Sequence, residues 1–236
     1  MPLQSHPLPA NQLLAALPEE EYDRLTSGSE RVRLSPGKVL FAAGEEVCHA
    51  YFPLSGMASL LSSTEDDRSV EVAVVGNEGM LGIPVVLRVG RSPYLIMAQL
   101  PTEALVIRAD TLRSEFDRGG QLRELILKHA LALLTQLAQS AACHRFHTVE
   151  QRMARWLLMT RDRAGSDSFR LTQEFLSYML GVPRTSISAF AAAMQKAGLI
   201  AYSRGSITVL DARGLEAASC DCYRVVMREI ARMLAT

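Results

Sequence analysis

The sequence has few cysteines, few aromatic residues and no long apolar run among its 236 residues. Four cysteines are too few for a disulfide scaffold, so we expect reduced thiols. The longest apolar runs, at 130–134 and 189–194, are far shorter than the roughly 18 residues that cross a bilayer. The first residues also lack the basic and then apolar pattern of a secretory signal. We therefore expect a cytoplasmic protein with no membrane partner.

The chain also lacks net charge, because 25 Lys+Arg balance 25 Asp+Glu. This balance excludes a histone-like binder of nucleic acid, which needs a strong basic excess. The charge is nevertheless unevenly distributed. Residues 1–144 carry 12 Lys+Arg and 17 Asp+Glu, residues 145–213 carry 10 and 5, and residues 214–236 carry 3 and 3. Such asymmetry between segments indicates local contact with nucleic acid.

Short β segments are predicted over residues 30–107. They are separated by turn sequences such as Ser35-Pro36-Gly37, and the polar tip 64–68 favours a β-hairpin. Residues 13–25 predict a small helical segment before them. Many short strands about 8 to 12 residues apart indicate a β-sandwich or barrel. We assign residues 1–118 to one domain of this type.

A long amphipathic helix is predicted over residues 120–143, because apolar residues recur at steps of three and four. The main stripe includes Leu122, Ile126, Leu133 and Leu137. One interpretation is that this stripe packs only on the core of its own domain. Apolar surface outside the stripe is left by Leu125, Leu131 and Leu134. We therefore also expect the helix, assigned to residues 119–146, to contact its copy in a homodimer.

Residues 171–200 are typical of a helix-turn-helix. Thr172 is placed as the N-cap of the first helix, and Gly181 permits a tight turn. Pro183 suits the start of the second helix, where its missing N–H is not needed. Gly198 is suited to end this second helix.

A hairpin is predicted next, over residues 201–210, with its turn at Arg204-Gly205. We therefore predict a winged helix-turn-helix within residues 147–236, which also include a C-terminal helix. The N-terminal end of the second helix would enter a major groove, and the wing would place a cation beside phosphates. The candidate DNA-binding residues are Thr172, Gln173, Arg184, Thr185, Ser186, Ser188 and Arg204. A plain packing unit is the alternative, but the wing and the local basic excess favour DNA.

The order of these segments, with the motifs 171–174, 181–184 and 198–200, resembles the Crp/Fnr family of bacterial transcription regulators over nearly the whole chain. The resemblance implies an α+β fold with a cyclic-nucleotide-binding-like β-roll or jelly roll, a dimerisation helix and a winged helix-turn-helix. It also implies a homodimer on a palindromic site in double-stranded DNA, with RNA polymerase as a further partner.

Within this resemblance, Arg184 matches the first base-contacting arginine of the family motif. Thr185 and Ala189 stand where better-known members have a glutamate and a second arginine. The operator sequence therefore cannot be carried over from those members.

Family members that bind cyclic nucleotides use a Gly-Glu pair for the ribose and an Arg-Ser pair for the phosphate. Gly79-Met80 and Arg91-Ser92 correspond here, so the phosphate clamp is kept while the ribose acceptor is lost, unless Glu78 restores it in a shifted register. The candidate effector residues are Glu78, Gly79, Met80, Gly82, Arg91 and Ser92. We expect a small-molecule effector other than cyclic AMP, or none, with a redox signal and a cyclic nucleotide as alternatives.

Two groups of metal-binding residue types stand far apart in the sequence. No cysteine precedes Cys48, which excludes the N-terminal iron–sulfur cluster of some family members. Cys220-Asp221-Cys222 has no second pair at zinc-finger spacing. His144 and His147 follow Cys143 at a predicted helix end. Neither group supplies enough ligands by itself, so we predict no metal and no cofactor, with redox sensing by the Cys220 and Cys222 thiols as the alternative.

No catalytic triad, phosphate-binding loop or paired-carboxylate motif occurs in the sequence, so we predict that the protein is not an enzyme. The leading hypothesis is a sequence-specific DNA-binding regulator. A second is a ligand sensor that acts through protein contacts with a degenerate DNA-binding domain. A third is a regulator that responds to a cyclic nucleotide.

Overall fold

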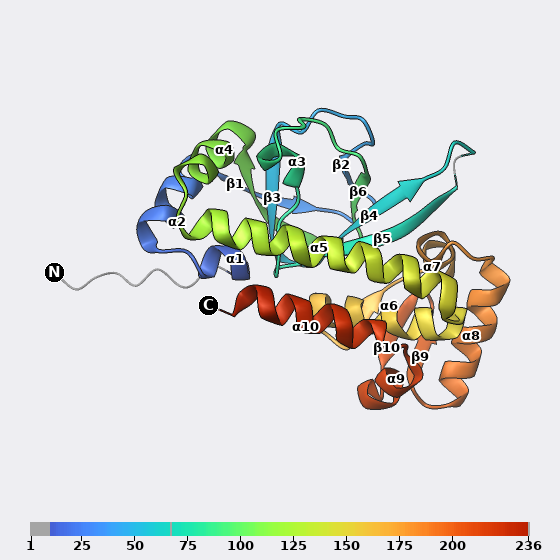
Figure 1. Cartoon of the computed structure of the whole chain (residues 1–236). Coiled ribbons are helices and arrows are strands. Elements are labelled where there is room, and N and C mark those ends of the chain that lie inside the picture. Colours follow the sequence, from blue (N-terminus) through green and yellow to red (C-terminus); the bar gives the residue numbers. More distant parts are fainter. Residues whose placement is uncertain (1–9, 67, 236) are drawn as a thin grey trace.

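The structure is a computed structural model that describes residues 10–66 and 68–235, and it confirms the predicted α+β fold. A β-rich part and a helical part with a small sheet lie toward opposite ends of the molecule, and the long helix α5 (Gln121–Phe146) runs along both (Figure 1).

Two antiparallel sheets form the β-rich part. One has the order β1-β7-β3, with β1 at Glu30–Leu34, β7 at Thr102–Arg108 and β3 at His49–Ser55. The other has the order β2-β6-β4-β5, with β2 at Val39–Phe41, β6 at Leu95–Ala98, β4 at Ala58–Ser63 and β5 at Ser69–Val75. Because β4 and β5 pair antiparallel as far as Ser63 and Ser69, the predicted β-hairpin between these strands is confirmed.

Short helices surround the sheets. They are α1 (Gln12–Ala15), α2 (Glu19–Thr26), α3 (Ile83–Val86) and α4 (Ala109–Arg118). The sequence pattern did not predict α4, because its buried face combines Leu112 with the carboxylate Glu115. Glu115 is tolerated there because Arg24 on α2 donates to it over 3.0 Å and Arg118 pairs with it over 2.8 Å.

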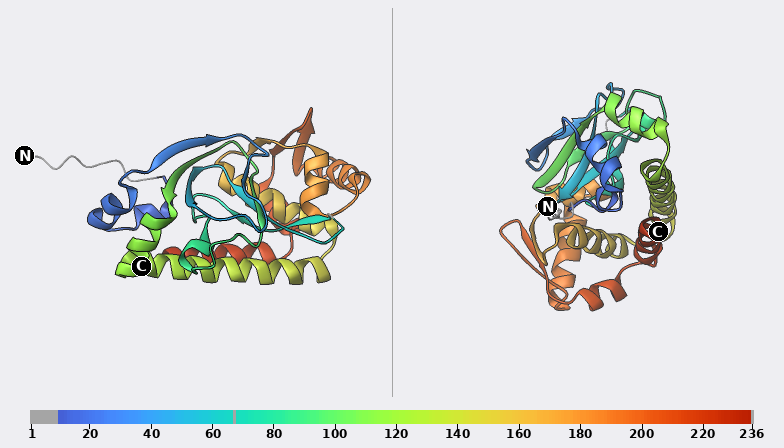
Figure 2. Two further views of the ribbon diagram at one scale, coloured as in Figure 1. Left: turned by 90° about the horizontal axis from the view of Figure 1, so that it is seen from above. Right: turned by 90° about the vertical axis from the view of Figure 1, so that its left-hand side faces the viewer.

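Helix α5 is fixed at its start and along its length by polar contacts. The Glu21 carboxylate accepts from the backbone N–H groups of Gln121 and Leu122 at 3.1 and 2.8 Å, which caps the helix. Further along, the Gln136 amide exchanges two hydrogen bonds with the backbone of Val74 on β5, at 2.7 and 3.1 Å. A helix α10 (Cys222–Leu234) runs beside α5 (Figures 1 and 2).

The helical part begins with α6 (Val149–Ala164), which starts in a capping box between Thr148 and Gln151. The helices that follow are α7 (Gln173–Leu180), α8 (Arg184–Lys196) and α9 (Ala212–Ala218). A small sheet has the order β8-β10-β9, with β8 at Ser168–Arg170, β10 at Ser206–Val209 and β9 at Ile200–Ser203. The predicted helix-turn-helix and wing are therefore both formed.

One apolar cluster joins the two parts. Met57, Leu61 and Val74 from the β-rich part belong to the same buried cluster as Leu157 and Leu158 on α6. The helical part is thus packed directly against the sheets as well as being connected through α5. This contact fixes the position of the helix-turn-helix relative to the β-rich part.

Candidate nucleic-acid interface and ligand cavity

The helix-turn-helix consists of α7, a three-residue turn and α8. Gly181 ends α7 in the left-handed region, with φ +62°, which a glycine adopts at little cost. Pro183 then precedes the first residue of α8. Ile187, Ala191 and Met194 face the core, so the exposed face of α8 presents Arg184 and Thr185 at its N-terminal end. This is the end that the sequence analysis assigned to base contacts.

Other predicted contact residues are held by local hydrogen bonds. The Thr172 hydroxyl accepts from the N–H of Phe175 at 3.1 Å, so it caps α7 as expected. The Ser188 hydroxyl donates to the Gln173 side-chain oxygen over 2.6 Å, which links α8 to the start of α7. Ser186 lies half-buried on the first turn of α8. Gln173 and Ser188 are therefore oriented by each other.

The wing is the hairpin of β9 and β10. Its two turn residues both have positive φ, +49° for Arg204 and +74° for Gly205, as a tight hairpin turn requires. The Gly205 carbonyl accepts from the N–H of Leu171 at 2.8 Å, and the Tyr202 hydroxyl donates to the Leu171 carbonyl at 3.2 Å. These bonds hold the wing, with Arg204 at its tip, beside the start of the helix-turn-helix.

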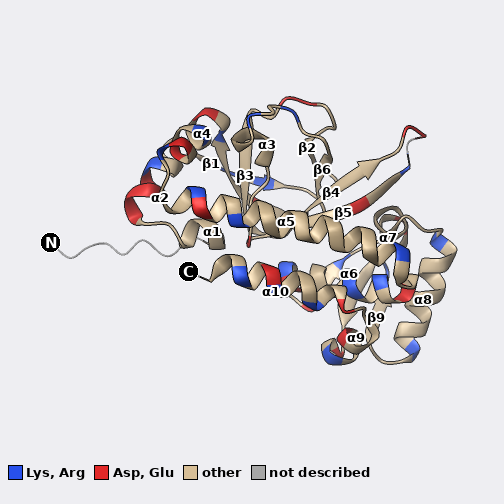
Figure 3. Ribbon diagram, viewed as in Figure 1, with Lys and Arg blue, Asp and Glu red and all other residues tan. Residues whose placement is uncertain are grey.

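The basic segment 145–213 is only partly a basic surface. Arg152, Arg155 and Arg163 are buried, and Arg161 pairs with Asp167. The exposed cations of this segment without a carboxylate partner in the described part of the chain are Arg145, Arg170, Arg184, Lys196, Arg204 and Arg213. Figure 3 shows α8 with a basic residue near each end and no acidic residue. The charge count therefore overstated the surface charge.

Arg170 is a candidate contact residue that the sequence analysis missed. It is exposed on β8, directly opposite Ser206 in the register of the wing sheet. This position puts it next to the Arg204 turn and two residues before the Thr172 cap. The sequence feature that could have identified Arg170 is its position immediately before the 171–174 motif.

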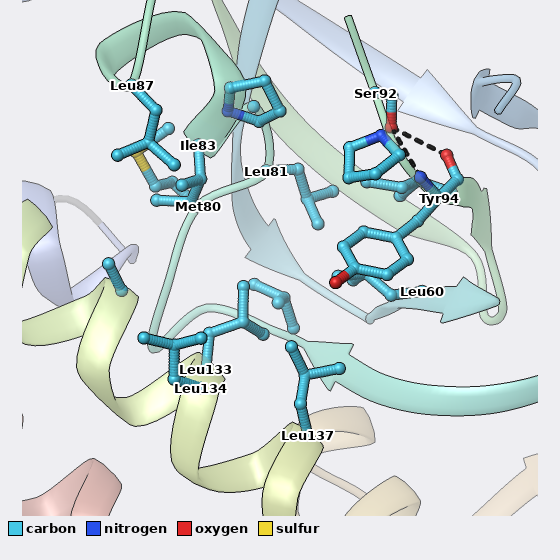
Figure 4. A pocket seen from close by; sticks show the side chains of 16 residues that line it. Leu60, Met80, Leu81, Ile83, Leu87, Ser92, Tyr94, Leu133, Leu134 and Leu137 are labelled. Carbon is cyan, nitrogen blue, oxygen red and sulfur yellow. Dashed lines mark hydrogen bonds between the residues drawn. The ribbon is translucent and has the colours of Figure 1, made fainter. Parts of the chain in front are cut away.

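A cavity of about 260 Å³ lies between the second sheet and α5 (Figure 4). Its walls are almost entirely apolar and include Leu60, Val75, Leu81, Ile83, Leu87, Ile96, Leu133, Leu134 and Leu137. Of the predicted effector residues, Met80, Gly82 and Ser92 line it. The Ser92 hydroxyl already donates to the Tyr94 carbonyl over 2.7 Å. The cavity wall thus has few polar groups that could bind a charged or sugar-like ligand.

The other predicted effector residues, Glu78, Gly79 and Arg91, do not line the cavity. The expected phosphate clamp is therefore not formed there. Arg91 and Ser92 are neighbours on an extended segment, so their side chains point to opposite sides. Arg91 is exposed and its Nη1 donates to the Gly44 carbonyl over 2.7 Å. Glu78 does not restore a ribose acceptor, because it is buried in an ion pair with Arg163, Oε1 to Nη2 2.6 Å.

Gly79 brings the loop after β5 close to α5. A Cβ at this position would lie 2.4 Å from the Cε1 atom of His129, so only glycine allows the approach. Burial lowers the pKa of His129, and its Nε2 atom lies 2.9 Å from the Met80 carbonyl oxygen. The loop that carries Met80 into the cavity wall is therefore attached to α5.

The predicted dimer residues on α5 need a correction. Leu122 and Ile126 are only 2% and 1% exposed and pack in the core of their own chain, so they are not available to a partner. Leu133 and Leu137 are half-buried and line the cavity. The exposed stripe of α5 consists instead of Leu127, Leu131, Leu134, Ala138 and Ala141. Their steps of four and three residues match the seam of a two-helix coiled coil.

The two cysteine and histidine groups, kept apart in the sequence analysis, meet in the structure. Cys143 lies on the last turns of α5, and His147 follows this helix. Cys220 lies two residues before α10, and Cys222 is the first residue of α10. Their sulfur and ring-nitrogen atoms are all within 4.8 Å of one another. His144 is not part of the group, because its Nδ1 bonds the Ser140 carbonyl at 2.7 Å.

Comparison with known families supports both parts of the fold. Residues 31–118 match the model of the cyclic nucleotide-binding domain, and residues 151–218 match that of the Crp-like helix-turn-helix domain. These two domains in this order define a transcription regulator with a DNA-binding domain. The chain belongs to the Crp/Fnr family, whose members are transcription regulators rather than enzymes.

Similar proteins are spread over several bacteria. A CRP-like cAMP-activated global transcriptional regulator of Mycobacterium tuberculosis is 23% identical over 198 residues, 81% of this chain and 88% of that protein. FixK2 from Bradyrhizobium japonicum has TM-score 0.68 and 13% identity, covering 81% of this chain and 98% of FixK2. The c-di-GMP responsive global regulator CLP of Xanthomonas campestris has TM-score 0.66 and 17% identity, covering 82% and 100%. These structures share the fold. None of the helices in the described residues is long and apolar enough to span a membrane.

Proposed function

We propose that the protein is a homodimeric, cytoplasmic regulator that binds a palindromic DNA site through its winged helix-turn-helix. The observation that carries this proposal is the exposed N-terminal end of α8, with Arg184 and Thr185, set beside the Arg204 wing by the bonds to Leu171. A helix end of this kind reads base edges in a major groove, while a wing cation contacts phosphates. On a promoter, RNA polymerase would be the further partner.

The proposal divides the chain into a sensor unit, residues 1–118, a dimerisation helix, 119–146, and a DNA-binding unit, 147–236. The exposed leucine and alanine stripe on α5 supports a parallel pair of these helices. Such a dimer would present two copies of α8 to half-sites about one DNA turn, roughly 34 Å, apart. Leu134 belongs both to this stripe and to the cavity wall, so a second α5 would lie close to the mouth of the cavity.

The DNA-binding proposal is tested by selection from a random double-stranded library with the full-length protein at physiological salt. We expect enrichment of an inverted repeat whose two halves are centred about one helical turn apart. The affinity for the enriched site should fall steeply with added salt, because phosphate contacts release counterions. If no motif is enriched, with or without ligand, the alternative of a sensor acting through protein contacts is favoured.

For the effector, we propose a small, neutral and mainly apolar molecule rather than a cyclic nucleotide. Three observations support this. The cavity walls are apolar, the Ser92 hydroxyl already donates to the Tyr94 carbonyl, and Arg91 is exposed and donates to the Gly44 carbonyl. A phosphate left without a cation in such a cavity would be strongly disfavoured. We expect toluene or indole to raise the melting temperature of the protein, and cyclic AMP and cyclic GMP to leave it unchanged.

The test needs a variant that fills the cavity. Ala130 on α5 lines the cavity, so Ala130→Trp should abolish the shift with toluene or indole while the protein still melts cooperatively. A shift with cyclic AMP that is lost in Arg91→Ala would contradict the proposal and restore the phosphate clamp.

A further inference from the structure

Four metal-binding side chains meet where α5 ends and α10 begins. Cys143 and His147 are one helical turn apart at the end of α5. Cys220 and Cys222 flank Asp221, and Cys222 is the first residue of α10. The Sγ atoms of Cys143 and Cys220 are 3.5 Å apart, and the Sγ of Cys222 is 3.3 Å from Nδ1 of His147. All three cysteines are buried, and they form a separate cluster inside the protein.

These distances fit the edges of a tetrahedron around a zinc ion. With Zn–S bonds of about 2.3 Å and Zn–N bonds of about 2.0–2.1 Å, ligand atoms are separated by about 3.8 Å for two sulfurs and about 3.6 Å for sulfur and nitrogen. Three cysteines and one histidine are a usual ligand set for structural zinc. A disulfide, in contrast, needs two sulfurs about 2.05 Å apart and leaves the other two side chains unexplained.

The surroundings of the cluster also suit a metal site. The second ring nitrogen of His147, Nε2, lies 3.6 Å from the Asp221 carboxylate, which is longer than a hydrogen bond but on the side where a metal-binding histidine usually has a carboxylate. The Gln139 side-chain amide donates to the Cys222 sulfur over 3.0 Å, which suits a thiolate. Both groups are therefore placed to orient ligands.

The charges around the cluster are complementary to a bound metal. Zn²⁺ with three thiolates and a neutral imidazole carries a net charge of about −1. Arg155 and Arg152 on α6 are buried close to Cys143. Their Nε atoms have no hydrogen-bond partner within the described residues. A buried guanidinium N–H group without a hydrogen-bond acceptor is costly, and the negative charge of a metal centre would offset part of this cost.

We propose that Cys143, His147, Cys220 and Cys222 bind one Zn²⁺ ion in a closed, structural site. The ion would join the end of α5, the connection between α5 and α6, and the start of α10. Since α5 carries the dimer stripe and α6 opens the DNA-binding unit, the site would fix the angle between these two helices. Four protein ligands leave no open position for substrate, so the role is structural.

The test uses the full-length protein without an affinity tag, purified under reducing conditions. Elemental analysis should find one zinc per chain. Replacement of zinc by Co²⁺ in the wild-type protein should give the intense visible absorption bands of a tetrahedral thiolate site. This measurement needs no variant. Removing zinc with a chelator should lower the melting temperature, because metal binding is coupled to folding.

Variants then assign the ligands. Cys220→Ser, Cys222→Ser and His147→Gln should each lose zinc and the Co²⁺ bands, while Cys48→Ser and His144→Gln serve as matched controls and keep both. Protein that takes up no stoichiometric zinc or Co²⁺ would overturn the proposal, as would iron in place of zinc. Equal zinc in ligand and control variants, or a Cys143–Cys220 disulfide in the isolated protein, would also overturn it.

Discussion

Arg163 on α6 reaches into the β-rich part and pairs with Glu78, with its Nη2 and Nε atoms 2.6 and 2.8 Å from Oε1. Both side chains are buried. Glu78 lies in the loop after β5, two residues before Met80, which lines the cavity and bonds His129 on α5. A single loop thus contacts the cavity, the long helix and the first helix of the DNA-binding unit. The loop therefore connects the cavity wall at Met80 to α6 at Arg163.

The first prediction concerns this ion pair. Glu78→Gln should destabilise the protein by about 3–5 kcal/mol, because it leaves the buried Arg163 charge without its partner. Arg163→Met should have a similar effect, and the double variant should be less destabilised than the sum of the two. Urea denaturation followed by the fluorescence of Trp156 measures all three. Strictly additive effects would show that the pair carries no coupling.

The second prediction concerns base recognition. Arg184→Ala should weaken binding to the selected site by about 1–3 kcal/mol and relax the preference at one base pair in each half-site. Lys196→Ala, at the other end of α8, is the matched control and should leave the base preference unchanged. Selection and competition binding with both variants distinguish the two effects. An unaltered base preference in Arg184→Ala would exclude direct readout by this residue.

The third prediction separates the two roles of Arg204. Its φ of +49° is unfavourable for a residue with a side chain, so Arg204→Gly should stabilise the protein by up to about 1 kcal/mol. The same variant should bind DNA more weakly and reduce the salt slope by about 1, because it removes one phosphate contact. Arg204→Lys keeps the charge and should bind nearly as well as wild type. A loss of binding in both variants would show that the contact needs the guanidinium group and not only a positive charge.

Local patterns predicted much of this fold, since many elements depend on nearby residues alone. Thr172 caps α7, Gly181 makes the turn, and the Arg204 hairpin forms as expected because each is a short-range interaction. Helix α4 escaped prediction because its buried Glu115 is satisfied by Arg24, 91 residues away. The order of the domains followed from the resemblance to the family.

The site was less predictable, because it depends on side-chain direction and on long-range contacts. The sequence predicted that Arg91 and Ser92 act together on one ligand. Only the backbone conformation shows that Arg91 faces solvent and Ser92 faces the cavity. Likewise, Cys143 and Cys220 are 77 residues apart, and no sequence interval indicates that their sulfurs meet. The apolar periodicity predicted the helix α5 correctly. It did not show which of its leucines pack in the core of the chain and which remain exposed.

The fourth prediction concerns pH. Burial raises the pKa of Glu71 to about 7, and its Oε2 lies 2.7 Å from the Ser59 hydroxyl, which is also 2.6 Å from the Gln99 side-chain oxygen. A single hydroxyl proton cannot serve both oxygens, so a protonated Glu71 that donates to Ser59 completes the chain. The folded state then binds more protons than the unfolded state between pH 4.5 and about 7. Stability should therefore fall as pH rises through this window, by up to about 3 kcal/mol.

Glu71→Gln tests this assignment, because glutamine keeps a donor for Ser59 and does not titrate. The variant should lose most of the fall in stability between pH 4.5 and 7 measured by urea denaturation. Glu65→Gln, an exposed residue on the hairpin tip, is the control and should keep the wild-type pH profile. If Glu71→Gln follows the wild-type profile, another group is responsible.

The last prediction concerns the dimer. Leu131 is 57% exposed at the middle of the α5 stripe and does not line the cavity, so Leu131→Glu should leave the fold of one chain intact. In a symmetric dimer it would remove two leucine contacts, each worth about 1.5–3 kcal/mol, and weaken association by about 100-fold or more. Sedimentation should then show monomers at concentrations where wild type is dimeric, and binding to a two-half-site DNA should weaken. Leu210→Glu, 60% exposed but away from α5, should remain dimeric. Dimers of unchanged affinity in Leu131→Glu would place the interface on another face of the molecule.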